Sequence, residues 1–163
     1  MTSHPRRRAF ALACAAAALT GAGATPAQTA APAADGLIKV RSRYPMDETI
    51  RRIREDIAAK GIMFFQAVDQ ARLAAAAGIT LRPSTLLEFG NPPLGAQFLT
   101  SNPYAGLDWP VRVLVLEDEQ GTVWAAYTDF AWIARRHGIA DRQVQFAMAS
   151  SVVESITSTV RAR

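Results

Sequence analysis

The segment LEFGNPPLGAQF, residues 87–98, constrains the fold more than any other part of the sequence. An apolar run leads into Gly90, Pro92 excludes Asn91 from the α region, and proline is favoured in a first helical turn. This order predicts a strand that passes at once into a helix. We expect Gly90 to permit the reversal of the chain and Asn91 to cap a helix that runs to about Thr100.

Apolar periodicity predicts the remaining elements. Alternation predicts strands over residues 37–44, 62–68, 84–89, 111–117 and 122–127, the last two joined as a hairpin. Helical spacing predicts helices over residues 47–60, 70–78, 131–138 and 142–159. This succession predicts an α+β fold in which a mainly antiparallel sheet is covered on one face by helices.

The sequence also predicts the start of the first long helix and the buried face of the last one. Asp47 is a plausible cap for the first long helix. The last helix repeats an apolar residue every four positions, at Met148, Val152, Ile156 and Val160. Such a stripe predicts the face that packs on the sheet.

Several charged side chains are predicted to lie on solvated surfaces. In the first long helix, Arg51 is four residues from Glu55 and Arg52 is four residues from Asp56. Such pairs contribute only about 0.2–0.5 kcal/mol each. The acidic residues 117–119 at the hairpin tip lack the spacing of a calcium loop, so we interpret them as solubilising.

The N-terminal residues 1–27 have the order of a cleaved secretory signal. Three arginines precede an apolar run over residues 9–19, and small residues with possible cleavage sites follow. The apolar run is too short to span a membrane, although a retained anchor stays an alternative. Lipid attachment at Cys14 is a further alternative. Because Arg7-Arg8 resembles the twin-arginine signal, general secretion and twin-arginine export both stay open as export routes.

Residues 28–36 are predicted to form a flexible linker, and residues 37–163 a single periplasmic or secreted domain. Cleavage of the signal leaves 15 basic and 14 acidic side chains, so the net charge falls from +4 to +1. That charge does not fit a nucleic-acid binder. Cleavage also removes Cys14 and His4 and leaves His137 as the one histidine, which excludes a Cys/His metal cluster. We expect no metal and no cofactor.

The predicted corner is the first candidate binding site. A helix N-terminus can bind an anion, because unpaired backbone N–H groups and the helix dipole point there. Pro92 and Pro93 remove two of these donors, which favours a simpler interpretation. In that interpretation Asn91 only caps the helix and Gly90 only turns the chain.

Arg112 and His137 are the other candidate ligand-binding residues. Arg112 interrupts an apolar strand, and its guanidinium suits a carboxylate or a phosphate. We favour the simpler interpretation, in which Arg112 faces water or pairs with Asp108 or Glu88. His137 ends a short helix, where a cation complements the dipole, so a structural role is favoured for it. The sequence shows no catalytic motif.

The segments FGNPPLGAQFL and NPYAGLDWPVRVLVLEDEQGTVWAAYTDFAWIARRHGI resemble the domain-of-unknown-function family DUF302. The likeness extends over residues 37–139. The resemblance implies an α+β domain with a layout similar to that of the TATA-binding protein, and it implies a homodimer. It implies no established activity. The family often has Asp-His where this chain has Asp69-Gln70, and an apolar residue at Glu88. Gln70 cannot titrate, which argues against a catalytic role there.

These observations favour a dimeric periplasmic module that binds a small or anionic ligand near Asn91 and Arg112, or that serves as an interaction module. We expect no nucleic-acid partner and no transmembrane anchor after signal cleavage. One alternative is a hydrolase-like enzyme that uses Asp69, Glu88 or His137 as acid or base. Another is a purely structural partner without a ligand pocket.

Overall fold

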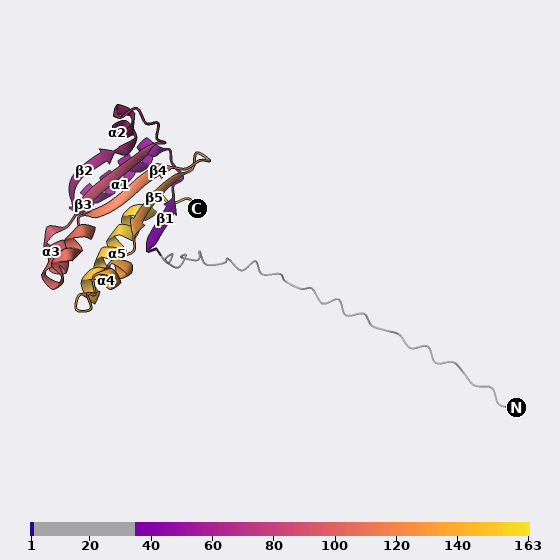
Figure 1. The fold of residues 1–163 in the computed structure, drawn as a ribbon. Coiled ribbons are helices and arrows are strands. Elements are labelled where there is room, and N and C mark those ends of the chain that lie inside the picture. The colour runs from indigo at the N-terminus through magenta and orange to yellow at the C-terminus, as the bar shows by residue number, and fades with distance from the viewer. Residues whose placement is uncertain (2–34) are drawn as a thin grey trace. The chain divides into compact units, whose positions relative to one another are not determined.

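The computed structural model describes Met1 and residues 35–163 (Figure 1). Apart from Met1, the predicted signal lies outside the described residues, as does nearly all of the predicted linker. The strands are β1 (Leu37–Arg41), β2 (Met63–Asp69), β3 (Ser84–Gly90), β4 (Val111–Glu117) and β5 (Val123–Thr128). The helices are α1 (Met46–Ala59), α2 (Gln70–Ala76), α3 (Pro92–Ser101), the 3-10 helix η1 (Pro103–Asp108), α4 (Phe130–Arg136) and α5 (Gln143–Ser158).

The five strands form one sheet in the order β1-β5-β4-β3-β2. Every neighbouring pair is antiparallel, which confirms the predicted sheet type. Because β1 and β2 lie at opposite edges, α1 carries the chain across the whole sheet. Helix α2 lies at one end of the sheet, and α3 and α4 lie at the other end (Figure 1).

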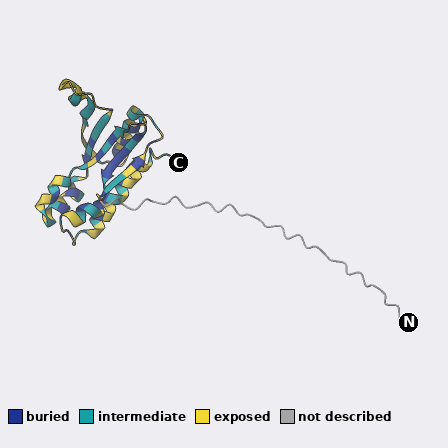
Figure 2. Ribbon diagram, turned by 45° about the vertical axis from the view of Figure 1, so that its right-hand side comes forward, coloured by how far each residue is buried: buried dark blue, intermediate teal, exposed yellow. Residues whose placement is uncertain are grey.

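The core lies between the sheet and the helices α1 and α5. Alternate strand residues point to this side, so Leu87, Phe89, Val113 and Val115 are almost completely buried. Ile53 and Ile57 of α1 and Val153 and Ile156 of α5 meet them, with no more than 1% of their surface exposed. Buried positions accordingly gather on the central strands (Figure 2). Burial of each such side chain contributes about 1.5–3 kcal/mol.

The opposite face of the sheet carries a row of apolar side chains that are half-buried, except for the buried Ala126. Leu86 is paired in register with Leu114, which is paired with Ala126. Leu116 and Trp124 form the next row. Neither α1 nor α5 covers this face, which we call the open sheet face.

Helix α5 packs through a different face from the predicted stripe. Val160, just beyond the helix, and Ile156 are buried as expected, but 55% of the surface of Met148 is exposed. The other buried positions of the helix are Phe146, Ala149, Val153 and Thr157. An α-helix turns by 100° per residue, so a repeat of four drifts by about 40° at each step. The predicted stripe therefore leaves the core as it approaches the start of the helix.

The start of α1 also differs from the prediction. Asp47 is not the cap, because the helix begins at Met46 and Pro45 occupies the N-cap position without a side-chain hydrogen bond. The Pro45 carbonyl accepts the Thr49 N–H at 2.9 Å. Asp47 instead adds negative charge to the first turn, where it complements the helix dipole.

One of the two predicted ion pairs on α1 forms. Arg51 pairs with Glu55, but Arg52 pairs with Glu48 rather than with Asp56. Arg51 also donates from Nε and Nη2 to the two carboxylate oxygens of Glu48. The hydrogen bonds from Arg51 and Arg52 lower the pKa of Glu48 from 4.5 to about 2.

Within the acidic hairpin tip, Asp118 has a structural role that the sequence analysis missed. Its Oδ1 accepts the backbone N–H groups of Gln120 and Thr122, at 3.0 and 2.8 Å. Its Oδ2 accepts the Trp124 indole N–H at 2.7 Å. Asp118 thus closes the turn and fixes Trp124 on the open sheet face.

Candidate functional site

The strand-to-helix corner forms as predicted, with Asn91 as the cap of α3. Asn91 Oδ1 accepts the Leu94 N–H at 3.3 Å, and the Asn91 carbonyl accepts the Gly95 N–H at 2.8 Å. Pro92 and Pro93, the first two helical residues, have no N–H. No backbone donor is left in this first turn for an anion.

Gly90 has a different role from the predicted one. It is the last residue of β3 and is not among the glycines with positive φ, so the reversal does not depend on its conformational freedom. The indole of Trp109 lies against the corner instead. A Cβ atom added at Gly90 would lie 3.3 Å from Trp109 Nε1, and one added at Gly95 would lie 1.9 Å from it. Phe65 contacts the same indole edge-on, with ring centroids 5.9 Å apart.

A cleft of about 350 Å³ lies beside this corner, between α5, α3 and the C-terminal end of α1. We call it the α5 cleft. Its apolar lining consists of Ile62, Phe89, Leu94, Val111, Met148, Ala149, Val152 and Val153, with Gly90 in the wall. Lys60 and Asn91 are the polar residues of the lining. The volume and the mainly apolar lining match those of sites that bind small molecules.

Arg112 and His137 meet at Asp108, away from the α5 cleft. His137 Nε2 lies 2.6 Å from Asp108 Oδ2, and both side chains are at least 94% buried. Arg136 binds both carboxylate oxygens, at 3.0 and 3.1 Å. Arg112 reaches Asp108 Oδ1 at 3.3 Å and the Leu107 carbonyl at 2.7 Å. We call these four charged or titratable residues the Asp108 cluster.

The Asp108 cluster ties η1 and β4 to α4 and leaves no room for a ligand. The void beside Asp108 and Arg112 measures about 20 Å³, which holds about one water molecule. Val111 lines both this void and the α5 cleft. The four predicted site residues therefore separate into Gly90 and Asn91 at the cleft, and Arg112 and His137 in the cluster.

The other two proposed acid–base residues also make structural contacts outside the α5 cleft. Asp69 caps α2 by accepting the Arg72 N–H at 2.9 Å. Glu88 accepts a hydrogen bond from Gln66 at 2.7 Å. Among residues 35–163, no three His, Cys, Asp or Glu side chains gather in a way that could hold a metal ion.

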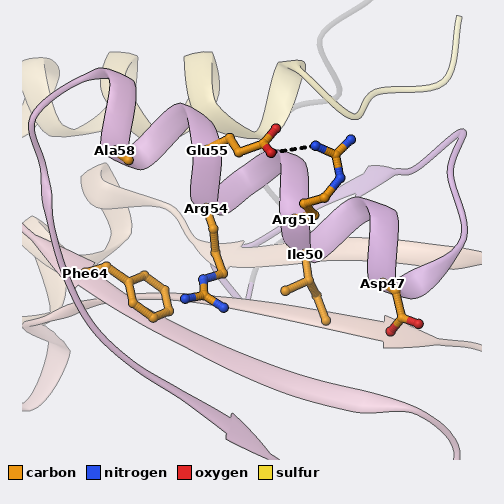
Figure 3. A pocket seen from close by; sticks show the side chains of 7 residues that line it. All are labelled: Asp47, Ile50, Arg51, Arg54, Glu55, Ala58 and Phe64. Carbon is orange, nitrogen blue, oxygen red and sulfur yellow. Dashed lines mark hydrogen bonds and ion pairs between the residues drawn. The ribbon is translucent and has the colours of Figure 1, made fainter.

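A second hollow lies on the outer side of α1, beside strand β2 (Figure 3). Its volume is about 510 Å³. The Arg54 guanidinium lies 4.7 Å from the centre of the Phe64 ring, and Arg51 pairs with Glu55. Figure 3 shows these partners turned toward one another along the groove. Because the two arginine side chains of this hollow are already paired with Phe64 and Glu55, we favour the α5 cleft as the ligand site.

The sequence analysis missed Lys60 and Leu94 as lining residues of the cleft. It did single out Met148 and Val152, but as residues that pack on the sheet. The 40° drift of their four-residue repeat is the sequence signal that could have placed Met148 and Val152 in the cleft wall. Side chains that leave the core face of a helix gradually come to form its flank, and here that flank is a wall of the cleft.

Comparison with solved structures shows a similar fold in the "uncharacterized conserved protein DUF302 from Bacillus stearothermophilus". The TM-score is 0.71 with 19% identity, over 78% of this chain and 100% of the other. The model of the DUF302 family, described as a domain of unknown function, matches residues 38–161.

Two curated relatives are each named fluoride-specific ion channel FluC 1, from Brucella suis biovar 1 (strain 1330) and Brucella abortus biovar 1 (strain 9-941). Each is 39% identical over 104 residues, or 64% of this chain. The match spans 41% and 38% of their lengths, about two fifths. In the described part of this chain, no helix has the length and apolarity to cross a membrane. The family match, which covers most of the chain, shows that this protein belongs to the DUF302 family.

Proposed function

We propose that the domain binds a small, mainly apolar molecule in the α5 cleft, as a periplasmic or secreted module released by cleavage of residues 1–27. One observation carries this proposal. The Gly90-Asn91 corner lines an apolar cleft of about 350 Å³ on the helical side of the sheet. Mainly apolar pockets with a few polar groups are the usual form of small-molecule sites.

The lining of the α5 cleft favours binding over catalysis. Lys60 is its one titratable side chain. Asp69, Glu88 and His137, the candidate acids and bases of a hydrolase, are not among the lining residues. Replacing each of them by the corresponding amide or by Gln is therefore expected to leave ligand binding in the cleft unchanged.

The proposal is tested by filling the cleft. Val152→Phe adds bulk to the wall, whereas Val144→Phe adds the same bulk on α5 at a residue that is 69% exposed and outside the lining. Binding is measured with phenylnaphthylamine, a neutral dye that fluoresces in apolar sites. We expect the wild type and Val144→Phe to bind the dye and Val152→Phe to bind it at least about tenfold more weakly, a loss of about 1.4 kcal/mol. Equal binding by all three proteins would contradict the proposal.

We also propose that the module is a homodimer, joined through the open sheet face. The face presents half-buried apolar side chains from three adjacent strands, including Leu86, Leu114 and Trp124. Two such faces can pack on each other as the layers of a sandwich do, and a two-fold arrangement closes the assembly.

The names of the Brucella relatives favour a second candidate, an interaction module that serves a fluoride channel. The 104 matched residues of this chain correspond to about two fifths of proteins that carry that name. If this candidate is right, a host strain without the gene should accumulate more fluoride than the parent strain, as measured with a fluoride electrode. Unchanged fluoride accumulation and unchanged growth in fluoride would exclude it.

A further inference from the structure

The polar groups around the α5 cleft offer hydrogen-bond donors. Asn91 Oδ1 already accepts the Leu94 N–H, and no hydrogen bond joins Asn91 Nδ2 to another of residues 35–163. The amide nitrogen carries two N–H donors. Because Asn91 is a lining residue, these donors are available to a molecule in the cleft.

Lys60 adds a positive charge to the same lining. It occupies the C-cap position of α1, and its Nζ binds Asp56, which is not a lining residue. An ammonium group has three donors, so this contact leaves two of them for a ligand. The Lys60 side chain is 31% exposed. Its stem can cover apolar surface while its charge stays at the rim, as is common for lysine.

The rest of the lining suits an apolar body of variable shape. Phe89, Val111 and Val153 form a part of the wall that belongs to the core or its edge. Met148, half-exposed at the side of the cleft, is unbranched and polarisable, so it can adapt to different ligands. None of the lining side chains carries a negative charge.

From these groups we infer that the natural ligand is an amphiphilic monocarboxylate, such as a medium-chain fatty acid or an aryl-substituted acid. Its apolar body lies along α5, and its carboxylate accepts hydrogen bonds from Lys60 and Asn91. An alkyl ammonium finds no acidic side chain in the lining and meets the charge of Lys60. This inference rests on the proposed function, since it specifies the ligand of the same cleft.

The test compares three probes with one chain length: decanoate, decanol and decylamine. Each competes with phenylnaphthylamine for the full mature protein. We expect decanoate to displace the dye at the lowest concentration. Lys60→Met should weaken decanoate binding by about three- to fivefold, the effect of one partly exposed ion pair, and leave decanol binding unchanged. Lys60→Arg should restore decanoate binding.

Lys39→Met is the matched control, because Lys39 is the other lysine of the chain and belongs to β1 rather than to the cleft. It should leave all three affinities unchanged. Failure of the dye to bind the wild type would overturn the proposed function. If the dye binds but decanol competes as well as decanoate with the wild type, only the carboxylate inference is overturned. The wild-type comparison decides this point even if a Lys60 variant does not fold.

Discussion

At the scale of single residues, Trp109 limits the size of the side chains that fit at the corner. Its indole occupies the space that a side chain at Gly95 would need, and it contacts Phe65 of the edge strand β2. A ring held between a helix and a strand fixes the angle at which β3 gives way to α3. Gly95 is thus required by packing rather than by an unusual backbone conformation, and a side chain at Gly90 would press more mildly on the same indole.

We therefore expect Gly95→Ala to destabilise the fold, although alanine is the better helix former. The new Cβ would lie 1.9 Å from Trp109 Nε1, so the indole must move. Overpacking of this kind costs about 1–3 kcal/mol in the free energy of unfolding, measured by urea denaturation. Gly106→Ala is the control, because its Cβ would meet nothing closer than 3.8 Å. Similar stabilities for the two variants would show that Trp109 does not confine Gly95.

The Asp108 cluster gives a second prediction at this scale. Asp108→Asn removes a buried charge that holds Arg136 and His137. We expect a loss of about 2–3 kcal/mol in the free energy of unfolding, because buried partners of a charged group are left poorly satisfied. Glu55→Gln removes an exposed ion pair, so it should cost less than about 1 kcal/mol. Equal effects of the two substitutions would mean that the cluster does not hold η1 against α4.

At the scale of elements, the hairpin of β4 and β5 depends on one carboxylate. Hydrogen bonds from the Trp124 indole and from the Thr122 and Gln120 backbone lower the pKa of Asp118 below its ordinary value of 3.8. The turn is therefore tied to the ionised form of Asp118. This contact also links the tip of the hairpin to the open sheet face.

The lowered pKa predicts how the stability of the fold depends on pH. Since the folded-state pKa of Asp118 lies below the unfolded one, its contribution is present above pH 3.8 and is lost as the pH falls through the lowered folded value. We expect the urea midpoint to fall in this acidic range and the fluorescence of Trp124 to change with it. Asp118→Asn should reduce this pH dependence, whereas Glu119→Gln should keep it. An unchanged profile in Asp118→Asn would refute the role of this carboxylate.

The sequence predicted the elements of the fold better than the site. Alternation and helical spacing located the strands and helices, and the order Gly-Asn-Pro-Pro located the corner, because these signals are local. The pairing of Asp108 with His137 joins residues 29 positions apart. The α5 cleft needs three helices to converge. Such contacts depend on how elements pack, which periodicity within one element does not specify.

At the scale of the whole molecule, the two faces of the sheet have different roles in our proposals. The face under α1 and α5 supplies the core and the cleft, and the open sheet face supplies the dimer interface. Both roles follow from the same alternation along each strand, which places neighbouring residues on opposite faces. A ligand and a second copy of the chain can then bind without competing.

A charge in the middle of the open sheet face should separate the dimer. Leu114 lies on the central strand between Leu86 and Ala126. We expect Leu114→Glu to sediment as a monomer at concentrations where the wild type is a dimer, since a carboxylate buried in an apolar interface is costly. Val144→Glu, on the exposed side of α5, should stay dimeric. A dimer in both variants would place the interface elsewhere.

The most direct test of the central claim is the native mass of the protein purified from the envelope of its own host, compared with its denatured mass. We predict that the wild type and Val144→Phe have a native mass above that of an integral number of chains, and that Val152→Phe lacks this excess. The excess would be the molecule bound in the α5 cleft. No excess in any of the three proteins, or an equal excess in Val152→Phe, would contradict the account.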